Sequence, residues 1–147
     1  MSNAIYFQSY TNCLNATQFN LRFVGVGGTG VPTYLEGDGG YVTASGTATA
    51  TSTGSEWTLT RTSTGQLVLT SVNPWPGLYS ADGGLFLATA DTTNTSGIQF
   101  PAVPTQNSTT GIWTINLNVY VAATLTDLAT TQQMWLQIVM RNSLTSP

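Results

Sequence analysis

The clearest pattern in the chain is an alternation of apolar and polar residues, strongest towards the C-terminus. Every second residue of Trp113–Val121 is apolar, and those between are Thr, Asn or Tyr. This period of two predicts a strand with one buried face. Met134–Met140 alternates similarly, but its second face, which includes Trp135, is only partly polar, as in a central strand or one covered by a neighbouring subunit. The two segments are expected to pair as a long hairpin across residues 122–133.

A second hairpin is predicted upstream. Trp57–Arg61 alternates, Ser63–Gly65 supplies a turn and Leu67–Leu69 returns. The segment Asn73–Gly77 ends this hairpin, because two prolines so close together cannot donate into a central ladder.

The other elements are predicted from shorter signals. Asp82–Gly84 is expected to form a turn before a strand at 85–87. Phe19–Phe23 alternates and predicts one strand, whereas 25–40 is glycine-rich and expected to be irregular. The segment 104–111 is expected to be a polar loop.

These elements predict an all-β fold, a β-sandwich or jelly-roll-like domain with about seven or eight antiparallel strands and no substantial helix. The expected organisation is an N-terminal arm at 1–18 followed by one sandwich domain at 19–147. The arm is expected to dock on another protein or on another subunit, although a disordered tail would explain its polar composition equally well. Its candidate interface residues are Ile5, Tyr6, Phe7 and Tyr10.

Charge narrows the possible partners. Only 6% of the residues are charged, with three arginines, no lysine and no histidine, and the net charge is −3. Such a chain offers no basic surface for phosphates, so nucleic-acid binding is not expected. No apolar run approaches a membrane span and no signal peptide is visible, so a soluble product made in a cytoplasm is expected.

Candidate chemistry is sparse, and we expect no enzyme, no catalytic residues, no cofactor and no metal. The segment Gly25–Gly30 matches the dinucleotide fingerprint, but Pro32 and further glycines follow where a helix would be required. Glu36 with Asp38, and Asp82 beside two glycines, read better as turns than as calcium loops. Without histidine or lysine, the usual nucleophile–base pairs and zinc sites cannot be assembled.

The aromatic residues divide into two groups. Trp57 and Trp113 are in phase with apolar strand faces and are expected in the core. Trp75, Tyr79 and Trp135 are the better candidates for surface contacts, either subunit packing or sugar stacking.

The arginines are expected to be structural. Arg61 and Arg141 lie near strand ends, and each is expected to be committed to a carboxylate or to carbonyl groups.

The stretch from residue 57 to residue 143 resembles small virion structural proteins of tailed bacteriophages. The resemblance is carried by the hairpin Trp57–Leu69 with Arg61 and Gly65, the strand Ile112–Val121, and the terminal strand closing on Arg141-Asn142-Ser143. It implies a capsid decoration or cement protein, β-rich and homo-oligomeric, with a trimer favoured. Its partner would be the major capsid protein and its location the virion surface, after synthesis in the host cytoplasm.

Two other functions remain open. One is a carbohydrate-binding module or a fibre or tail adhesin domain, with Trp75, Tyr79 and Trp135 as stacking platforms. The other is a trimeric jelly roll like those of C1q and TNF.

Overall fold

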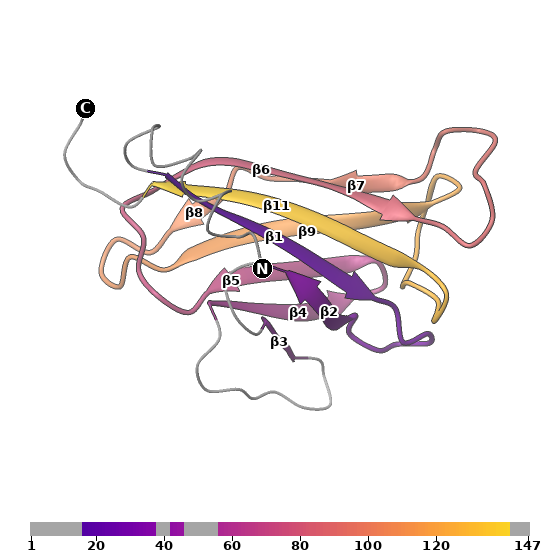
Figure 1. Ribbon diagram of the computed structural model, residues 1–147, viewed down its shortest axis with the longest axis horizontal. Helices are drawn as coiled ribbons and strands as arrows, with labels where there is room; N and C mark the ends of the chain where they lie inside the picture. The colour runs from indigo at the N-terminus through magenta and orange to yellow at the C-terminus, as the bar shows by residue number, and fades with distance from the viewer. Residues whose placement is uncertain (1–15, 38–41, 46–55, 142–147) are drawn as a thin grey trace.

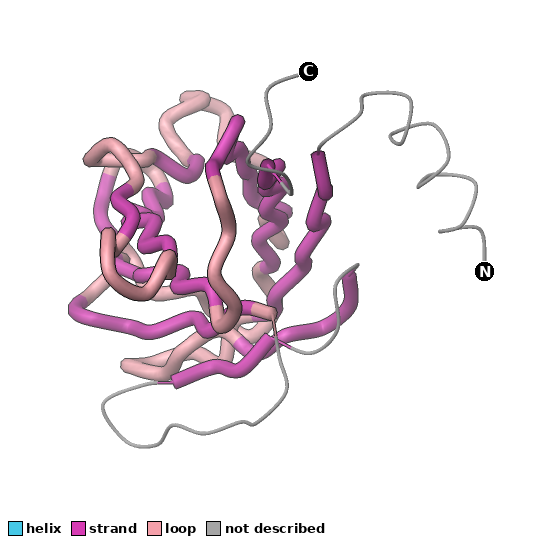
Figure 2. The backbone as a smooth tube through the Cα atoms, turned by 90° about the vertical axis from the view of Figure 1, so that its left-hand side faces the viewer, coloured by secondary structure: helices cyan, strands magenta, loops and turns pink. Residues whose placement is uncertain are grey.

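The computed structural model describes residues 16–37, 42–45 and 56–141 (Figure 1). In these ranges it has eleven strands, connected by loops and without a helix (Figure 2). The all-β prediction is therefore confirmed; three of the strands are only two or three residues long, which is why about seven or eight were expected. The arm residues Ile5, Tyr6, Phe7 and Tyr10, and the loop residue Asp38, lie outside the described residues.

One sheet has four antiparallel strands in the order β2-β1-β11-β6. The strands are β1 (Ala16–Val24), β2 (Thr33–Gly37), β6 (Gly77–Phe86) and β11 (Gln133–Arg141). Strand β1 faces β11 along its whole length, with Leu21 opposite Leu136. Because side chains alternate along each strand, this register places the apolar residues of both strands on the same face.

The other sheet has the order β10-β9-β5-β4-β3, with β7 and β8 also paired to β9. Its strands are β3 (Val42–Ser45), β4 (Trp57–Ser63), β5 (Gln66–Ser71), β7 (Gly97–Gln99), β8 (Thr105–Gln106), β9 (Trp113–Val121) and β10 (Thr124–Leu125). All these pairs are antiparallel except β3 with β4. The predicted hairpin is confirmed as β4 and β5. Gly65 lies in the turn between them, with a φ of 65°.

The two sheets pack face to face, and β1 and β11 lie in front of β9 and β5 in Figure 1. Each sheet contributes one apolar face to a single core. The buried core residues are Phe19, Leu21, Phe23, Trp57, Leu59, Leu67, Leu69, Ile115, Leu117, Val119, Leu128, Met134, Leu136, Ile138 and Met140. Trp57 is fully buried, and Trp113 packs against this core, as predicted.

The expected C-terminal hairpin does not form. Strand β9 lies in one sheet and β11 in the other, and the connection between them passes from sheet to sheet. Both edges of β11 are occupied, one by β1 and the other by β6. The apolar faces of β9 and β11 therefore meet across the core instead of side by side, because alternation determines the buried face of a strand but not its hydrogen-bonding neighbour.

The turn expected at Asp82–Gly84 is also wrong. These residues continue strand β6, where Gly83 and Gly84 pair with Leu136 and Trp135. A Cβ atom at Gly83 would lie 2.7 Å from the Leu136 side chain, and one at Gly84 would lie 2.6 Å from the Trp135 indole nitrogen. Only glycine fits at these positions, because large side chains of β11 lie against the backbone of β6. In the sequence, an Asp-Gly-Gly segment inside a strand looks the same as one that forms a turn.

Three boundaries differ from the sequence prediction. The region expected to be irregular contains β2, which pairs with β1 and places Tyr34 edge-on to Phe23 with ring centres 5.9 Å apart. The loop predicted at 104–111 contains β8. Strand β1 begins at Ala16, inside the predicted arm, because the ladder with β11 continues to the pair Ala16–Arg141.

Candidate functional site

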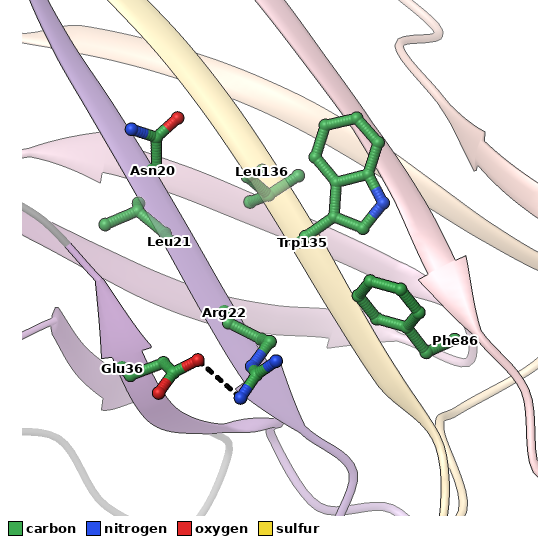
Figure 3. Close-up of a pocket in the computed structure, with 7 residues that line it drawn as sticks. All are labelled: Asn20, Leu21, Arg22, Glu36, Phe86, Trp135 and Leu136. Atoms are coloured by element: carbon green, nitrogen blue, oxygen red, sulfur yellow. Dashed lines mark ion pairs between the residues drawn. The ribbon is translucent and has the colours of Figure 1, made fainter. Parts of the chain in front are cut away.

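The outer face of the four-stranded sheet carries a shallow trough with a volume of about 390 Å³ (Figure 3). Side chains from all four strands line it, and they include two aromatic rings, an ion pair and an amide. The lining residues are Asn20, Leu21, Arg22, Glu36, Phe86, Trp135 and Leu136. Leu21 and Leu136 also line the trough, although both are buried core residues.

Two aromatic rings form one side of the trough. Trp135 on β11 is half-buried and lies against the backbone at Gly84, where a Cβ atom would come within 3.0 Å of three atoms of the indole. Phe86 is 52% exposed. It pairs with Gln133, two residues before Trp135, so the two rings are diagonal neighbours on the same face. Figure 3 shows them side by side.

The opposite side of the trough is polar. Arg22 and Glu36 are paired residues of β1 and β2, and their side chains form an ion pair. The Arg22 side chain is 38% exposed and that of Glu36 62%, so water screens the pair and it contributes little to stability. Its two charges offset each other, which leaves an array of hydrogen-bond donors and acceptors without net charge.

Amide side chains continue this polar side along the sheet. Asn20 and Gln137 face each other across β1 and β11. The Asn20 Oδ1 atom accepts hydrogen bonds from Gln18 Nε2 at 2.7 Å and from Gln137 Nε2 at 3.2 Å. The amide orientation is thereby held next to the aromatic rings.

The outer face of the seven-stranded sheet has a different character. In β4, β5 and β9 the only charged residue is Arg61, and it points into the sandwich. The outward side chains of these strands are uncharged, and most are polar. Nine of them form what we call the uncharged face: Thr58, Thr60, Gln66, Val68, Thr70, Thr114, Asn116, Asn118 and Tyr120. Thr58, Thr70 and Thr114 form one row across the three strands.

Arg61 is committed to a carboxylate, as predicted. Its Nε and Nη2 atoms donate to Asp127 Oδ1 and Oδ2 at 2.9 and 2.7 Å, and the Gly65 N–H donates to Oδ1 at 3.0 Å. Burial raises the pKa of Asp127, but the hydrogen bonds from Arg61 and Gly65 outweigh it and lower that pKa overall. The hydrogen bond to Asp127 raises the pKa of Arg61. This pair ties the β4–β5 turn to the segment after β10, a structural role.

A second carboxylate also has a structural role. Asp91 accepts hydrogen bonds from the backbone N–H groups of Thr93, Thr95 and Ser96 and from the Thr93 hydroxyl. Hydrogen bonds from Thr93 and Ser96 lower its pKa well below the usual range. The carboxylate holds the loop before β7 in place through hydrogen bonds with residues of that loop.

The three aromatic residues predicted for surface contacts do not share a site. Trp75 is half-buried and packs edge-on to Phe19 with ring centres 5.4 Å apart, so its ring belongs to the edge of the core. Tyr79 is 56% exposed and lines a separate hollow with Phe100 and Trp113. Trp135 alone lies in the trough.

The other residues that the sequence analysis singled out make contacts that stabilise the fold. Arg141 Nη2 donates to the Pro76 carbonyl at 3.3 Å, in agreement with the expected carbonyl contact. The Gly25–Gly30 segment forms a loop held by Gly25 and Gly27 N–H groups, which donate to the carbonyls of Gln132 and Leu128. No group of three or more His, Cys, Asp or Glu side chains suited to a metal occurs in the residues that the structure describes.

The sequence analysis did not identify Phe86, Arg22 or Asn20 as members of a site. The alternation of β1 was a usable signal for Asn20 and Arg22, since it places both opposite the apolar core residues. Phe86 had no such signal, because the strand predicted at 85–87 is apolar at every position and shows no alternation that would assign a face to Phe86.

Nothing in the described part of the chain forms a helix long and apolar enough to span a membrane. Comparison of the chain with family models, curated proteins and solved structures gave no match.

Proposed function

We propose that this protein is a non-enzymatic virion structural protein that binds the outer surface of a phage capsid and stabilises it. The observation that carries the proposal is the uncharged face of the seven-stranded sheet. The resemblance of residues 57–143 to virion proteins of tailed bacteriophages supports the same function. The major capsid protein is the proposed partner.

The uncharged face suits a protein partner for an energetic reason. Removing a charged side chain from water costs several kcal/mol unless a partner charge is well placed, whereas a hydroxyl or amide needs only a hydrogen bond. The buried centres of protein interfaces are accordingly depleted of charge. A face of Thr, Asn and Gln can be covered by another protein without a large desolvation cost.

The size of the face bears on the oligomeric state. Strands about 4.8 Å apart and residues about 3.3 Å apart give the outward face of β4, β5, β9 and the short strands beside β9 an area of roughly 500 Å². This is less than the roughly 800 Å² that each partner contributes to a standard stable interface. A single copy would bind weakly, so we propose a homo-oligomer, with a trimer favoured, whose several contacts supply avidity.

The test is binding of the purified chain to capsids of the phage that encodes it, prepared from a phage with this gene deleted. The bound copies are counted after sedimentation. Asn116→Arg places a charge in the middle of the uncharged face, and an unpaired interfacial charge costs about 2 kcal/mol or more, so binding should weaken roughly 30-fold. The Asn116 side chain is half-buried on the outward face of β9 and lies outside the core, so the variant should keep its melting temperature.

The matched control is Thr92→Arg, which adds the same charge in the exposed loop before β7. It should bind like the unmodified chain. The proposal fails if the unmodified chain does not sediment with the capsids, or if Asn116→Arg binds as well as Thr92→Arg does.

A further inference from the structure

We propose that the trough around Trp135 is a binding site for uncharged glycans, with a sugar ring stacked on the indole. The trough and the uncharged face lie on the outer faces of opposite sheets. Attachment of the uncharged face to a partner would therefore leave the trough exposed. The two proposals rest on different residues, and either can fail alone.

The position of Trp135 is the first step. Glycine at position 84 leaves the backbone of β6 bare beneath the indole, and the ring lies close against it. A ring supported in this way has one face covered by the sheet and is held without a large loss of entropy on binding. The apolar C–H face of a pyranose ring is complementary to an aromatic face of this kind, and sugar-binding proteins use Trp and Tyr for that reason.

The second aromatic ring extends the platform. Phe86 is more than half exposed and lies beside Trp135 along the trough (Figure 3). Within the residues that the structure describes, no neighbouring strand covers this ring, although a phenylalanine side chain is strongly apolar. Two adjacent rings on one flat sheet would accommodate consecutive units of a short oligosaccharide. The volume of about 390 Å³ lies towards the lower end of the range for small-molecule sites.

The polar side of the trough supplies hydrogen-bond donors and acceptors for sugar hydroxyls. Arg22 offers N–H donors and Glu36 offers carboxylate acceptors, and they lie across the trough from Trp135. A hydroxyl both donates and accepts, so a paired guanidinium and carboxylate matches neighbouring hydroxyls. An apolar peptide would leave these polar groups without replacement for the water that they lose, which favours a sugar over a peptide.

The charge of the face selects among glycans. Arg22 and Glu36 offset each other, and Asp82, on the same outer face opposite Gln137, adds a negative charge. The trough should therefore discriminate against acidic polysaccharides and favour neutral ones.

The experiment uses the full chain labelled with ¹⁵N at its four tryptophans, whose indole N–H resonances are followed by NMR. The neutral probes are hexasaccharides of β-glucose, α-glucose, xylose, mannose and N-acetylglucosamine, and the acidic probe is hexagalacturonate. At least one neutral probe should shift the Trp135 resonance, which is assigned from its absence in Trp135→Ala. Hexagalacturonate should bind more weakly.

Matched variants locate the site. Trp135→Ala should weaken binding about tenfold or more, since aromatic anchors dominate such sites. Glu36→Gln keeps the size of the side chain and should weaken binding less, which keeps the test informative if Trp135→Ala folds poorly. Tyr79→Ala removes an exposed aromatic ring of the same strand as Phe86 but outside the trough, and should bind normally. Asn116→Arg should also bind normally.

Three results would overturn the proposal. The first is that no neutral probe shifts the Trp135 resonance. The second is that hexagalacturonate binds best. The third is that Trp135→Ala and Glu36→Gln both bind as tightly as the unmodified chain, which would place the sugar elsewhere. A proline- and tyrosine-rich peptide that shifts Trp135 when no sugar does would assign the trough to protein docking instead.

Discussion

Replacing Gly65 by alanine should strongly destabilise the fold, because this buried glycine of the β4–β5 turn has no room for a side chain. Gly65 has a φ of 65° in the β4–β5 turn. A Cβ atom there would lie 2.5 Å from the Thr126 backbone nitrogen and 2.9 Å from the Val119 carbonyl oxygen. Real Cβ contacts are longer, and both of these neighbours are backbone atoms that cannot rotate away. The turn or the segment after β10 must therefore move.

The magnitude follows from two contributions. An alanine held in the left-handed region costs about 1–2 kcal/mol. Movement of the turn also weakens the hydrogen bonds from Val119 N–H to the Gly65 carbonyl, 2.7 Å, and from Gly65 N–H to Asp127, 3.0 Å, each worth about 1 kcal/mol. The sum is about 2–4 kcal/mol, a large part of the roughly 5–15 kcal/mol of a typical domain. For a chain of this length, the melting temperature should fall by roughly 6–13 °C.

The assay is urea unfolding followed by tryptophan fluorescence, with two other glycines as controls. Gly28 has a φ of 57° with nothing within 4 Å of an added Cβ, so Gly28→Ala should show only the backbone cost of about 1–2 kcal/mol. Gly97 has open space and no positive φ, so Gly97→Ala should change stability by less than about 0.5 kcal/mol. The reasoning is refuted if Gly65→Ala costs no more than Gly28→Ala.

Three further predictions concern the core, the ion pair between Arg61 and Asp127, and the trough. Trp57→Ala, in the fully buried core, should cost about 3–5 kcal/mol in urea unfolding, whereas Trp135→Ala should cost clearly less; equal losses would contradict the placement of Trp135 on the outer face. Asp127→Asn should make the free energy of unfolding less sensitive to acid, because the pKa of Asp127 is lower in the folded state than in the unfolded state. Its carboxylate therefore stabilises the fold above the unfolded-state pKa of about 4, and this stabilisation is lost as the pH falls through the folded-state pKa. Unfolding free energies from pH 2 to 7 check this, and identical pH profiles would count against it. Gly84→Ala should displace the indole and shift the Trp135 fluorescence to longer wavelength, whereas Gly97→Ala should not.

The candidate site was only partly accessible from the sequence. Trp135 was identified because it lies out of phase with the apolar face of its strand, and an out-of-phase aromatic residue must lie outside the core. Asn20 and Arg22 had the same kind of signal. No signal in the sequence indicated that these residues lie close to Phe86 and Glu36, because that proximity depends on which strands flank β1 and β11. Trp75 shows the converse: a proline-rich setting indicated the surface, and packing against Phe19 placed the ring at the edge of the core.

Local patterns were sufficient for features that depend on one strand or one turn. The alternation in Phe19–Phe23, Trp57–Arg61 and Trp113–Val121 determined which side chains are buried, because the period of a strand is two wherever it lies. The hairpin at Gly65 was equally local, since a short turn brings the two strands that it joins side by side.

Only the tertiary structure decided which strands are neighbours. Strands β9 and β11 have the alternation expected of a hairpin, yet β1 and β6 occupy both edges of β11, and β9 packs against it across the core. Gly83 and Gly84 likewise predicted a turn from the sequence, and only the structure shows that side chains of β11 cover them within a strand. Strand pairing depends on contacts between residues far apart in the chain, and the buried face of a strand is compatible with several partners. The trough, built from four such strands, exists only once that order is chosen.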